Sequence, residues 1–300
     1  MDSMNTNSTD MHGAGDTQPG WGHLTTATLG VGTLDLRVDG PEDGPPVVLL
    51  HGFPQTSLSW AGVAARLVAE GHRVIAPDQR GYSPGARPDG VEHYASDLLA
   101  DDVAELADVL GLETFHLVGH DWGASVAWVV AARHPERLRS LTAVSVPHLA
   151  AFGRALRESD DQREMSRYMQ LFRREGRAEE VLLADDARRL TAFYEGKVPA
   201  ADLAEYVRRF SDPAALTAAL NYYRAMQRWL NDLPAVTVPT TYVWSTGDRA
   251  LGRQGAEWCG DHVDADYRFV QIDDVTHWIP DEAPDALADA ILDRLTRPAG

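Results

Sequence analysis

The sequence is poor in residues that form crosslinks or metal sites. Its 300 residues include one cysteine, Cys259, and one lysine, Lys197. A single cysteine excludes an internal disulfide, and no spacing of cysteine and histidine resembles a metal-binding motif. We therefore expect a reducing, cytoplasmic location and neither a metal nor a cofactor. The single lysine among 27 basic residues indicates compositional bias and carries no predicted function.

Long apolar runs and positive charge are also scarce. No run approaches the roughly 20 apolar residues needed to cross a bilayer. The first 20 residues lack the basic start and apolar centre of a signal peptide. The formal net charge of -18 disfavours nucleic acid and anionic membranes as partners, because both would repel such a surface. We expect a protein that does not bind membranes and that has a disordered tail over residues 1–22. The sequence does not distinguish a monomer from a homodimer.

What is present is an alternation of extended and helical patterns. Extended segments are predicted at residues 33–38, 46–50, 73–77, 115–118, 141–146, 241–245 and 267–272, and helices at residues 59–70, 94–110 and 283–295. Alternation of this kind predicts an α/β fold with a mostly parallel sheet covered by helices on both faces. Between residues 148 and 234 it gives way to helical periodicity alone. We interpret 148–234 as an inserted helical cap that divides the core into residues 23–147 and 235–300.

The stretch LVGHDWGASV, residues 117–126, predicts a nucleophile elbow with Asp121 at its apex. An aspartate is ionised at neutral pH and needs no base to act as a nucleophile. Its attack on an ester would give a less stable anhydride, whereas attack on saturated carbon gives an ordinary ester. Asp121 therefore indicates an epoxide or an alkyl halide as substrate, with the enzyme ester then hydrolysed by water and a general base. The alternative is an aspartate that only caps a helix.

Five motifs in this order are similar to those of the α/β-hydrolase superfamily, in its epoxide hydrolase and haloalkane dehalogenase branch, and resemble soluble epoxide hydrolases most. They are His51-Gly52-Phe53-Pro54, residues 78–83 (DQRGYS), residues 119–123, Gly247-Asp248 and Thr276-His277-Trp278. The resemblance covers roughly residues 30–295. It implies an α/β-hydrolase fold with an all-helical cap over the nucleophile.

The resemblance also implies roles for individual residues. The superfamily order of nucleophile, acid and histidine selects Asp121, Asp248 and His277. A rival acid position in some relatives is empty here, since residues 147–156 contain no acidic residue. The amides implied for the oxyanion hole are those of Phe53 and Trp122, and the Phe53-Pro54 bond resembles a cis peptide of the family. The remaining residues assigned to the substrate pocket are Pro54, His148 and Trp278.

Two cap tyrosines distinguish an epoxide from a halide. An epoxide oxygen leaves as a basic alkoxide and needs a proton, which a tyrosine with a pKa near 10 can donate. Residues 221–224, Asn-Tyr-Tyr-Arg, resemble the Asn-Trp-Tyr-Arg signature of epoxide hydrolases, so Tyr223 takes the ring-opening position and Tyr222 is expected to pack. By its distance to Gly176, Tyr168 aligns with the second tyrosine, and Tyr194 and Tyr206 remain alternatives.

We therefore expect an epoxide hydrolase that converts a small apolar epoxide and water into a vicinal diol. A haloalkane dehalogenase is the first alternative, because Trp122 could bind halide. Those enzymes usually carry asparagine where this chain has Phe53, which cannot donate to the halide. A non-hydrolytic cyclase or a ligand receptor on the same fold is the second alternative.

Overall fold

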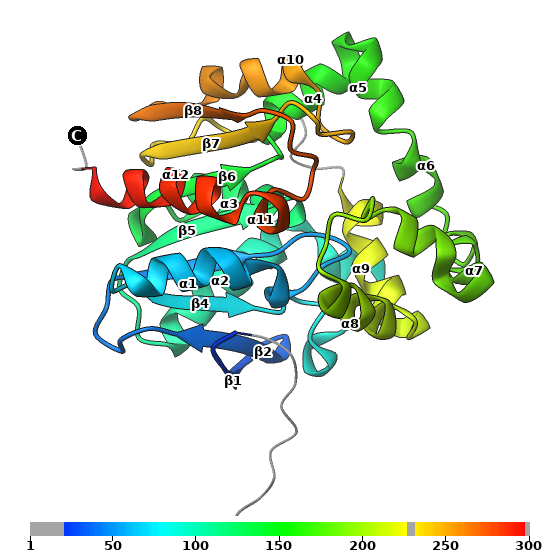
Figure 1. Ribbon diagram of the computed structural model, residues 1–300, viewed down its shortest axis with the longest axis horizontal. Helices are drawn as coiled ribbons and strands as arrows, with labels where there is room; N and C mark the ends of the chain where they lie inside the picture. Colours follow the sequence, from blue (N-terminus) through cyan, green and yellow to red (C-terminus); the bar gives the residue numbers. More distant parts are fainter. Residues whose placement is uncertain (1–20, 227–231, 298–300) are drawn as a thin grey trace, which may run out of the picture.

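The computed structural model describes residues 21–226 and 232–297 (Figure 1). Its centre is one sheet of eight strands in the order β1-β2-β4-β3-β5-β6-β7-β8. The strands are β1 (His23–Leu29), β2 (Gly32–Asp39), β3 (Pro46–Leu50), β4 (Arg73–Pro77), β5 (Phe115–His120), β6 (Leu138–Val144), β7 (Thr240–Ser245) and β8 (Tyr267–Ile272). Strand β2 pairs antiparallel with both of its neighbours, and the other pairs are parallel. The predicted fold class is confirmed.

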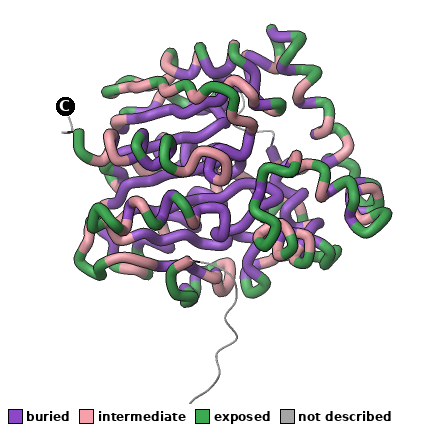
Figure 2. The backbone as a smooth tube through the Cα atoms, viewed as in Figure 1, coloured by how far each residue is buried: buried purple, intermediate pink, exposed green. Residues whose placement is uncertain are grey.

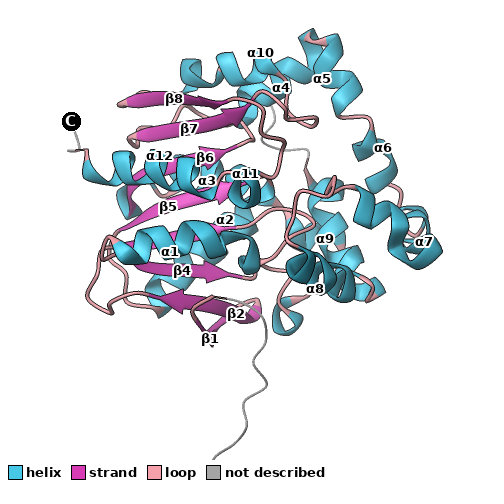
Figure 3. Cartoon of the chain, in the orientation of Figure 1, coloured by secondary structure: helices cyan, strands magenta, loops and turns pink. Residues whose placement is uncertain are grey.

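Helices cover both faces of this sheet (Figure 3). Alternate residues of β3 face opposite sides, as the twofold period of a strand requires. Val47 and Leu49 pack in an apolar cluster with residues of α1 (Ala61–Ala69), α11 (Ile279–Glu282) and α12 (Pro284–Thr296). Val48 and Leu50 belong to a second cluster with residues of α2 (Ser96–Val109) and α3 (Trp122–Arg133). Strands β3 to β7 are largely buried on both sides, whereas most residues of the edge strands β1 and β8 are exposed or half-buried (Figure 2).

The segment between β6 and β7 contains helices and, in its described part, no strand. These helices are α4 (Leu149–Glu158), α5 (Asp160–Met165), α6 (Tyr168–Phe172), α7 (Arg177–Ala192), α8 (Ala200–Phe210) and α9 (Pro213–Ala225). Helices α6 to α9 lie together at one end of the sheet (Figure 1), whereas α4 packs against α10 (Arg253–Glu257) of the core. Short 3-10 helices are η1 (Ser57–Trp60), η2 (Pro84–Ala86), η3 (Val91–Tyr94), η4 (Pro135–Arg137) and η5 (Cys259–His262).

Some predicted boundaries differ from the observed ones. The helix expected at 59–70 begins as the 3-10 turn η1 and becomes α-helical only at Ala61. The strand expected at 141–146 is β6, which starts at Leu138 and ends at Val144, because Ser145 adopts a positive φ of 67° and leaves the strand conformation. Of the predicted disordered tail, residues 1–20 lie outside the described residues. Trp21 differs from that prediction: its indole donates to Ser57 O and packs on the core.

No helix within residues 21–226 and 232–297 is both long enough and apolar enough to span a membrane.

Candidate active site

Asp121 lies at a sharp turn between β5 and α3, with φ 52° and ψ -118°. Two glycines make this turn possible. A Cβ at Gly119 would lie 2.2 Å from Gly123 O, and a Cβ at Gly123 would lie 2.0 Å from Leu50 O. Only glycine fits both positions, as a nucleophile elbow requires. The Asp121 side chain makes no capping hydrogen bond to α3, which removes the helix-cap alternative.

Three loops at the carboxyl ends of strands bring the predicted triad together. His277, after β8, places Nε2 3.4 Å from Asp121 Oδ2. Its Nδ1 is 2.9 Å from Oδ2 of Asp248, after β7. The other Asp248 oxygen accepts hydrogen bonds from the amides of Ala250 (2.7 Å) and Leu251 (3.0 Å). Asp248 is thus fixed by its own loop and can hold the imidazole with Nδ1 protonated.

The electrostatics of the triad favour an ionised pair. Burial alone would lower the pKa of His277, but Asp248 and Asp121 outweigh it and raise this pKa to about 10. Burial alone would raise the pKa of Asp121, yet the hydrogen bond and charge of His277 hold it below the usual 3.8. At neutral pH, Asp121 is therefore a carboxylate and His277 an imidazolium. Any reaction that removes the charge on Asp121 would lower the pKa of His277.

A backbone amide already binds one oxygen of Asp121. Phe53 N donates to Asp121 Oδ1 at 2.8 Å, which leaves Oδ2 as the oxygen nearer His277. Gly52 permits this approach, because a Cβ there would lie 2.3 Å from Asp121 Cβ. The Phe53-Pro54 peptide is cis. The second predicted amide, that of Trp122, begins α3 directly after Asp121.

The two predicted tyrosines come from different cap helices and meet over Asp121. Tyr223 on α9 and Tyr168 on α6 line one cavity of about 150 Å³ together with Asp121 and His277. The Tyr168 and Tyr223 rings lie edge to face with centroids 6.2 Å apart, and the Tyr223 ring lies edge to face with Trp122 at 4.8 Å. Burial is the main reason that the pKa of both tyrosines is raised. Neighbouring charged or ionisable groups, including Asp121, raise it further. Both hydroxyls therefore keep their protons at neutral pH.

The cavity is lined mainly by aromatic and apolar side chains. Pro54 and Trp278 line it as predicted. His148 does not: it caps the start of α4, where its Nε2 bonds Pro234 O and its ring stacks on His262 with centroids 4.8 Å apart. The full set of lining residues is Phe53, Pro54, Asp121, Tyr168, Phe172, Phe193, Glu195, Tyr223, Arg249, Ala250, His277 and Trp278.

Five of these residues, Phe172, Phe193, Glu195, Arg249 and Ala250, were not predicted. Arg249 and Ala250 directly follow Asp248, so their position next to the predicted acid could have indicated that they line the site. A larger polar cavity of about 350 Å³ lies between the β1–β2 edge and α8, but it contains none of the predicted site residues. The chemistry therefore belongs to the smaller, aromatic cavity.

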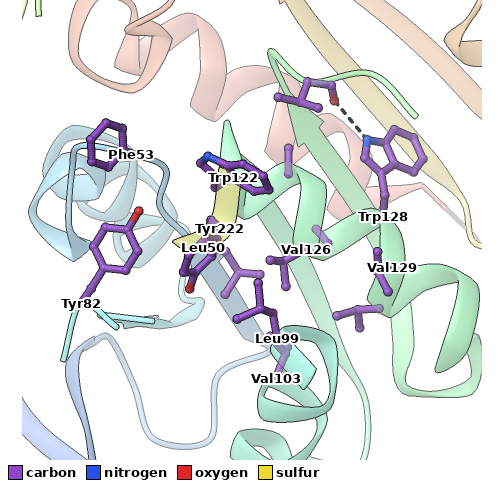
Figure 4. Packing of buried hydrophobic residues seen from close by; sticks show 14 of the residues in the cluster. Leu50, Phe53, Tyr82, Leu99, Val103, Trp122, Val126, Trp128, Val129 and Tyr222 are labelled. Carbon is purple, nitrogen blue, oxygen red and sulfur yellow. Dashed lines mark hydrogen bonds between the residues drawn. The ribbon is translucent and has the colours of Figure 1, made fainter. Parts of the chain in front are cut away.

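The other tyrosines have structural roles. Tyr222 points away from the cavity and donates to Arg80 O at 2.8 Å. Its ring packs against Trp122 in the apolar cluster beneath the site (Figure 4), with centroids 5.5 Å apart. Tyr194 donates to Pro54 O and stacks on Tyr206. None of these three tyrosines lines the cavity.

Metal-binding geometry is absent from the described part of the chain, where no group of three or more His, Cys, Asp and Glu could hold an ion.

The chain is similar to known proteins over nearly all of its length. The profile of the alpha/beta hydrolase fold family matches residues 45–284. The AB hydrolase superfamily protein YfhM of Bacillus subtilis is 36% identical over 270 residues, covering 88% of this chain and 94% of that protein. Epoxide hydrolase A of Mycobacterium tuberculosis is 31% identical over 299 residues, covering 86% and 93%.

Solved structures agree with the sequence relatives. An epoxide hydrolase from metagenomes of hot environments superposes with a TM-score of 0.81 at 31% identity, covering 93% of this chain and all (100%) of that one. Epoxide hydrolase A from Mycobacterium thermoresistibile gives a TM-score of 0.80 at 28% identity, covering 91% and 98%. With the elbow, the parallel sheet and the inserted helices, these likenesses assign the fold and its branch. The chain belongs to the α/β-hydrolase superfamily, in the branch that contains the epoxide hydrolases.

Proposed function

We propose that this protein is an epoxide hydrolase, which adds water to an epoxide to give a vicinal diol. The observation that carries the proposal is the set of residues that line one cavity: the carboxylate Asp121, the acids Tyr168 and Tyr223, and the base His277. The likeness to proteins named epoxide hydrolases supports the same reaction.

In the first step, Asp121 Oδ2 attacks a ring carbon of the epoxide and the carbon–oxygen bond of the ring breaks. Oδ2 is the nucleophile because Oδ1 is held by Phe53 N. The departing oxygen takes a proton from the tyrosine pair, Tyr168 and Tyr223, and an alkyl ester of Asp121 remains. Two acids over the nucleophile suit this step, since an alkoxide is a poor leaving group without a proton.

In the second step, water hydrolyses the ester. Alkylation removes the charge on Asp121, so the pKa of His277 falls and its proton passes through solvent to the tyrosinate that ring opening left, which leaves Nε2 free to act as a base. His277 then takes a proton from water, and the hydroxide attacks Cγ of Asp121. The tetrahedral oxyanion forms at Oδ1, where Phe53 N already donates. Its collapse expels the diol oxygen, which takes the proton held by His277. The proton left on the Asp121 carboxyl group then passes to His277, which regenerates the carboxylate and the imidazolium.

The alternatives fit less well. Trp122, the halide donor that a dehalogenase would use, packs edge to face with the Tyr223 ring at 4.8 Å between centroids, and the Phe53 side chain supplies no second donor. A halide also leaves as a stable anion, so two buried tyrosine acids would have no function in that reaction. A receptor or cyclase would not need a paired His277–Asp248 beside the carboxylate.

Steady-state hydrolysis of styrene oxide to its diol, followed by chromatography, tests the proposal against release of bromide from 1-bromohexane. We expect diol formation and little bromide. Rapid bromide release with no diol from any epoxide tested would make the protein a dehalogenase instead.

A further inference from the structure

The rim of the catalytic cavity carries an ion pair that the two-step reaction does not use. Glu195 Oε2 lies 3.0 Å from Arg249 Nη1. The described lining residues include two charged side chains besides Asp121 and His277, and these are Glu195 and Arg249. They come from different parts of the fold, since Glu195 follows α7 of the cap and Arg249 follows the acid Asp248 of the core.

The cap segment that carries Glu195 is attached to the core on both sides. Phe193 O accepts a hydrogen bond from the Trp278 indole, and Tyr194 donates to Pro54 O. Further along, Lys197 Nζ is 3.0 Å from Glu282. Glu195 itself has a positive φ of 52° and a side chain only 21% exposed, whereas the Arg249 side chain is 80% exposed. The carboxylate is thus the fixed member of the pair, and the guanidinium is the member free to reach other anions.

The charges at the rim set which substrates can enter. Asp121 is ionised at the floor of the cavity, and Glu195 adds a second fixed negative charge at its mouth. Arg249, the cation besides His277 among the described lining residues, is paired with Glu195. An anionic substrate would meet two carboxylates, and the cations beside them, His277 and Arg249, are already paired with Asp121 and Glu195. An uncharged substrate would meet the aromatic wall.

We propose that Glu195 is a specificity-determining residue that restricts this cavity to uncharged epoxides about the size of a single aromatic ring. The size follows from the cavity of about 150 Å³, because an apolar cavity of that volume holds one benzene molecule. The inference rests on the proposed function in one respect, that the substrate is an epoxide. The selection against anions concerns binding alone.

The test compares two matched substrates, 4-carboxystyrene oxide and 4-carbamoylstyrene oxide, which differ in charge and hardly in shape. Wild type should prefer the amide. In Glu195→Gln, Arg249 becomes available to a carboxylate, so the ratio of kcat/KM for the acid over the amide should rise about two- to fivefold, as expected for one partly exposed ion pair. The double variant Glu195→Gln with Arg249→Gln should lose that gain, and so should high salt.

A matched control removes the same charge elsewhere. Glu158 pairs with Arg154 on the exposed face of α4, outside the cavity, so Glu158→Gln should leave the ratio at the wild-type value. Binding of 4-ethylbenzoate and 4-ethylbenzamide, measured by calorimetry, repeats the comparison without turnover. An unchanged preference in Glu195→Gln, by rates or by binding, overturns the inference. Absence of diol from every epoxide, with the binding preference shifted as expected, would overturn only the proposed function.

Discussion

The core half and the cap half of the candidate site are held in place by different interactions. In the core, Asp121 and His277 are fixed by a glycine-dependent turn and by hydrogen bonds of 2.8 and 2.9 Å. In the cap, Tyr223 is surrounded by edge-on aromatic rings, including Phe172 at 4.9 Å and Trp122 at 4.8 Å between centroids. Directional bonds set the nucleophile and the base, and packing sets the proton donors. Substitutions in the core half should therefore abolish a step, and those in the cap half should slow one.

The largest effect is expected from Asp121→Ala, because the one other carboxylate among the described lining residues, Glu195, is paired with Arg249. Turnover of styrene oxide should fall by about 10⁴-fold or more, to the uncatalysed rate. Asp101→Asn, which alters a half-exposed ion pair with Arg133, serves as the control. Appreciable steady-state turnover by the Asp121→Ala enzyme would reject the elbow assignment.

His277→Gln should separate the two steps. The carboxylate can still attack, but no base activates water, so the ester accumulates. Intact-protein mass spectrometry after incubation with styrene oxide should detect an adduct with the mass of the whole epoxide. Continued diol formation with unmodified Asp121 would contradict the two-step scheme.

Tyr223→Phe should slow ring opening, because the alkoxide loses a proton donor that contributes typically about 10²- to 10⁴-fold. Tyr168→Phe should have an equal or smaller effect. The same changes should matter little for an alkyl bromide, whose leaving group needs no proton. Equal losses on matched epoxide and bromoalkane substrates would mean that the tyrosines only pack.

The pH dependence should differ between the two steps. The Asp121 pKa is lowered, so its carboxylate is lost only as the pH falls below 3.8, and both tyrosine pKa values are raised, so their protons are lost only above pH 10. Thus kcat/KM for an epoxide should be flat between about pH 6 and pH 9. If hydrolysis of the Asp121 ester limits kcat, kcat should fall by up to tenfold per pH unit once the pH lies below the pKa that His277 has in the ester intermediate. Single-turnover rates across this range check both expectations, and a kcat/KM that titrates near neutral pH would contradict the ionised Asp121–His277 pair.

The smallest effect is expected from Tyr222→Phe, which removes the hydrogen bond to Arg80 O. The loss should be about 1 kcal/mol of unfolding free energy, the usual value for one buried hydrogen bond. Urea unfolding measures it, and turnover should change far less than in Tyr223→Phe. A turnover loss equal to that of Tyr223→Phe would remove the distinction between these neighbours.

The core half of the site could be predicted because short stretches of sequence identify its residues. Asp121, Asp248 and His277 each lie within a short motif at a strand end, and a parallel sheet brings such ends to one edge. The strand ends themselves were less certain: β6 stops two residues early because of the Ser145 conformation, which no pattern in the sequence announces.

The cap half was predictable only in part. Tyr168 and Tyr223 were recognised by resemblance, and the structure brings them to one cavity. Phe172, Phe193 and Glu195 were missed, because which face of a cap helix or turn meets the cavity depends on how helices distant in sequence pack. His148 is predicted to line the substrate pocket, but its side chain caps α4 and its ring stacks on His262 instead.

Composition alone does not indicate where the only lysine of the chain lies in the fold. Lys197 Nζ lies 3.0 Å from Glu282, with 43% of its side chain exposed. Glu282 accepts a hydrogen bond from the amide of Thr276, the residue before His277. A lysine-acylating reagent would therefore modify a single side-chain amine, at the edge of the cap beside the histidine loop. Coupling to an amine-reactive support through that side chain would orient the molecules alike, with this edge of the cap turned toward the support.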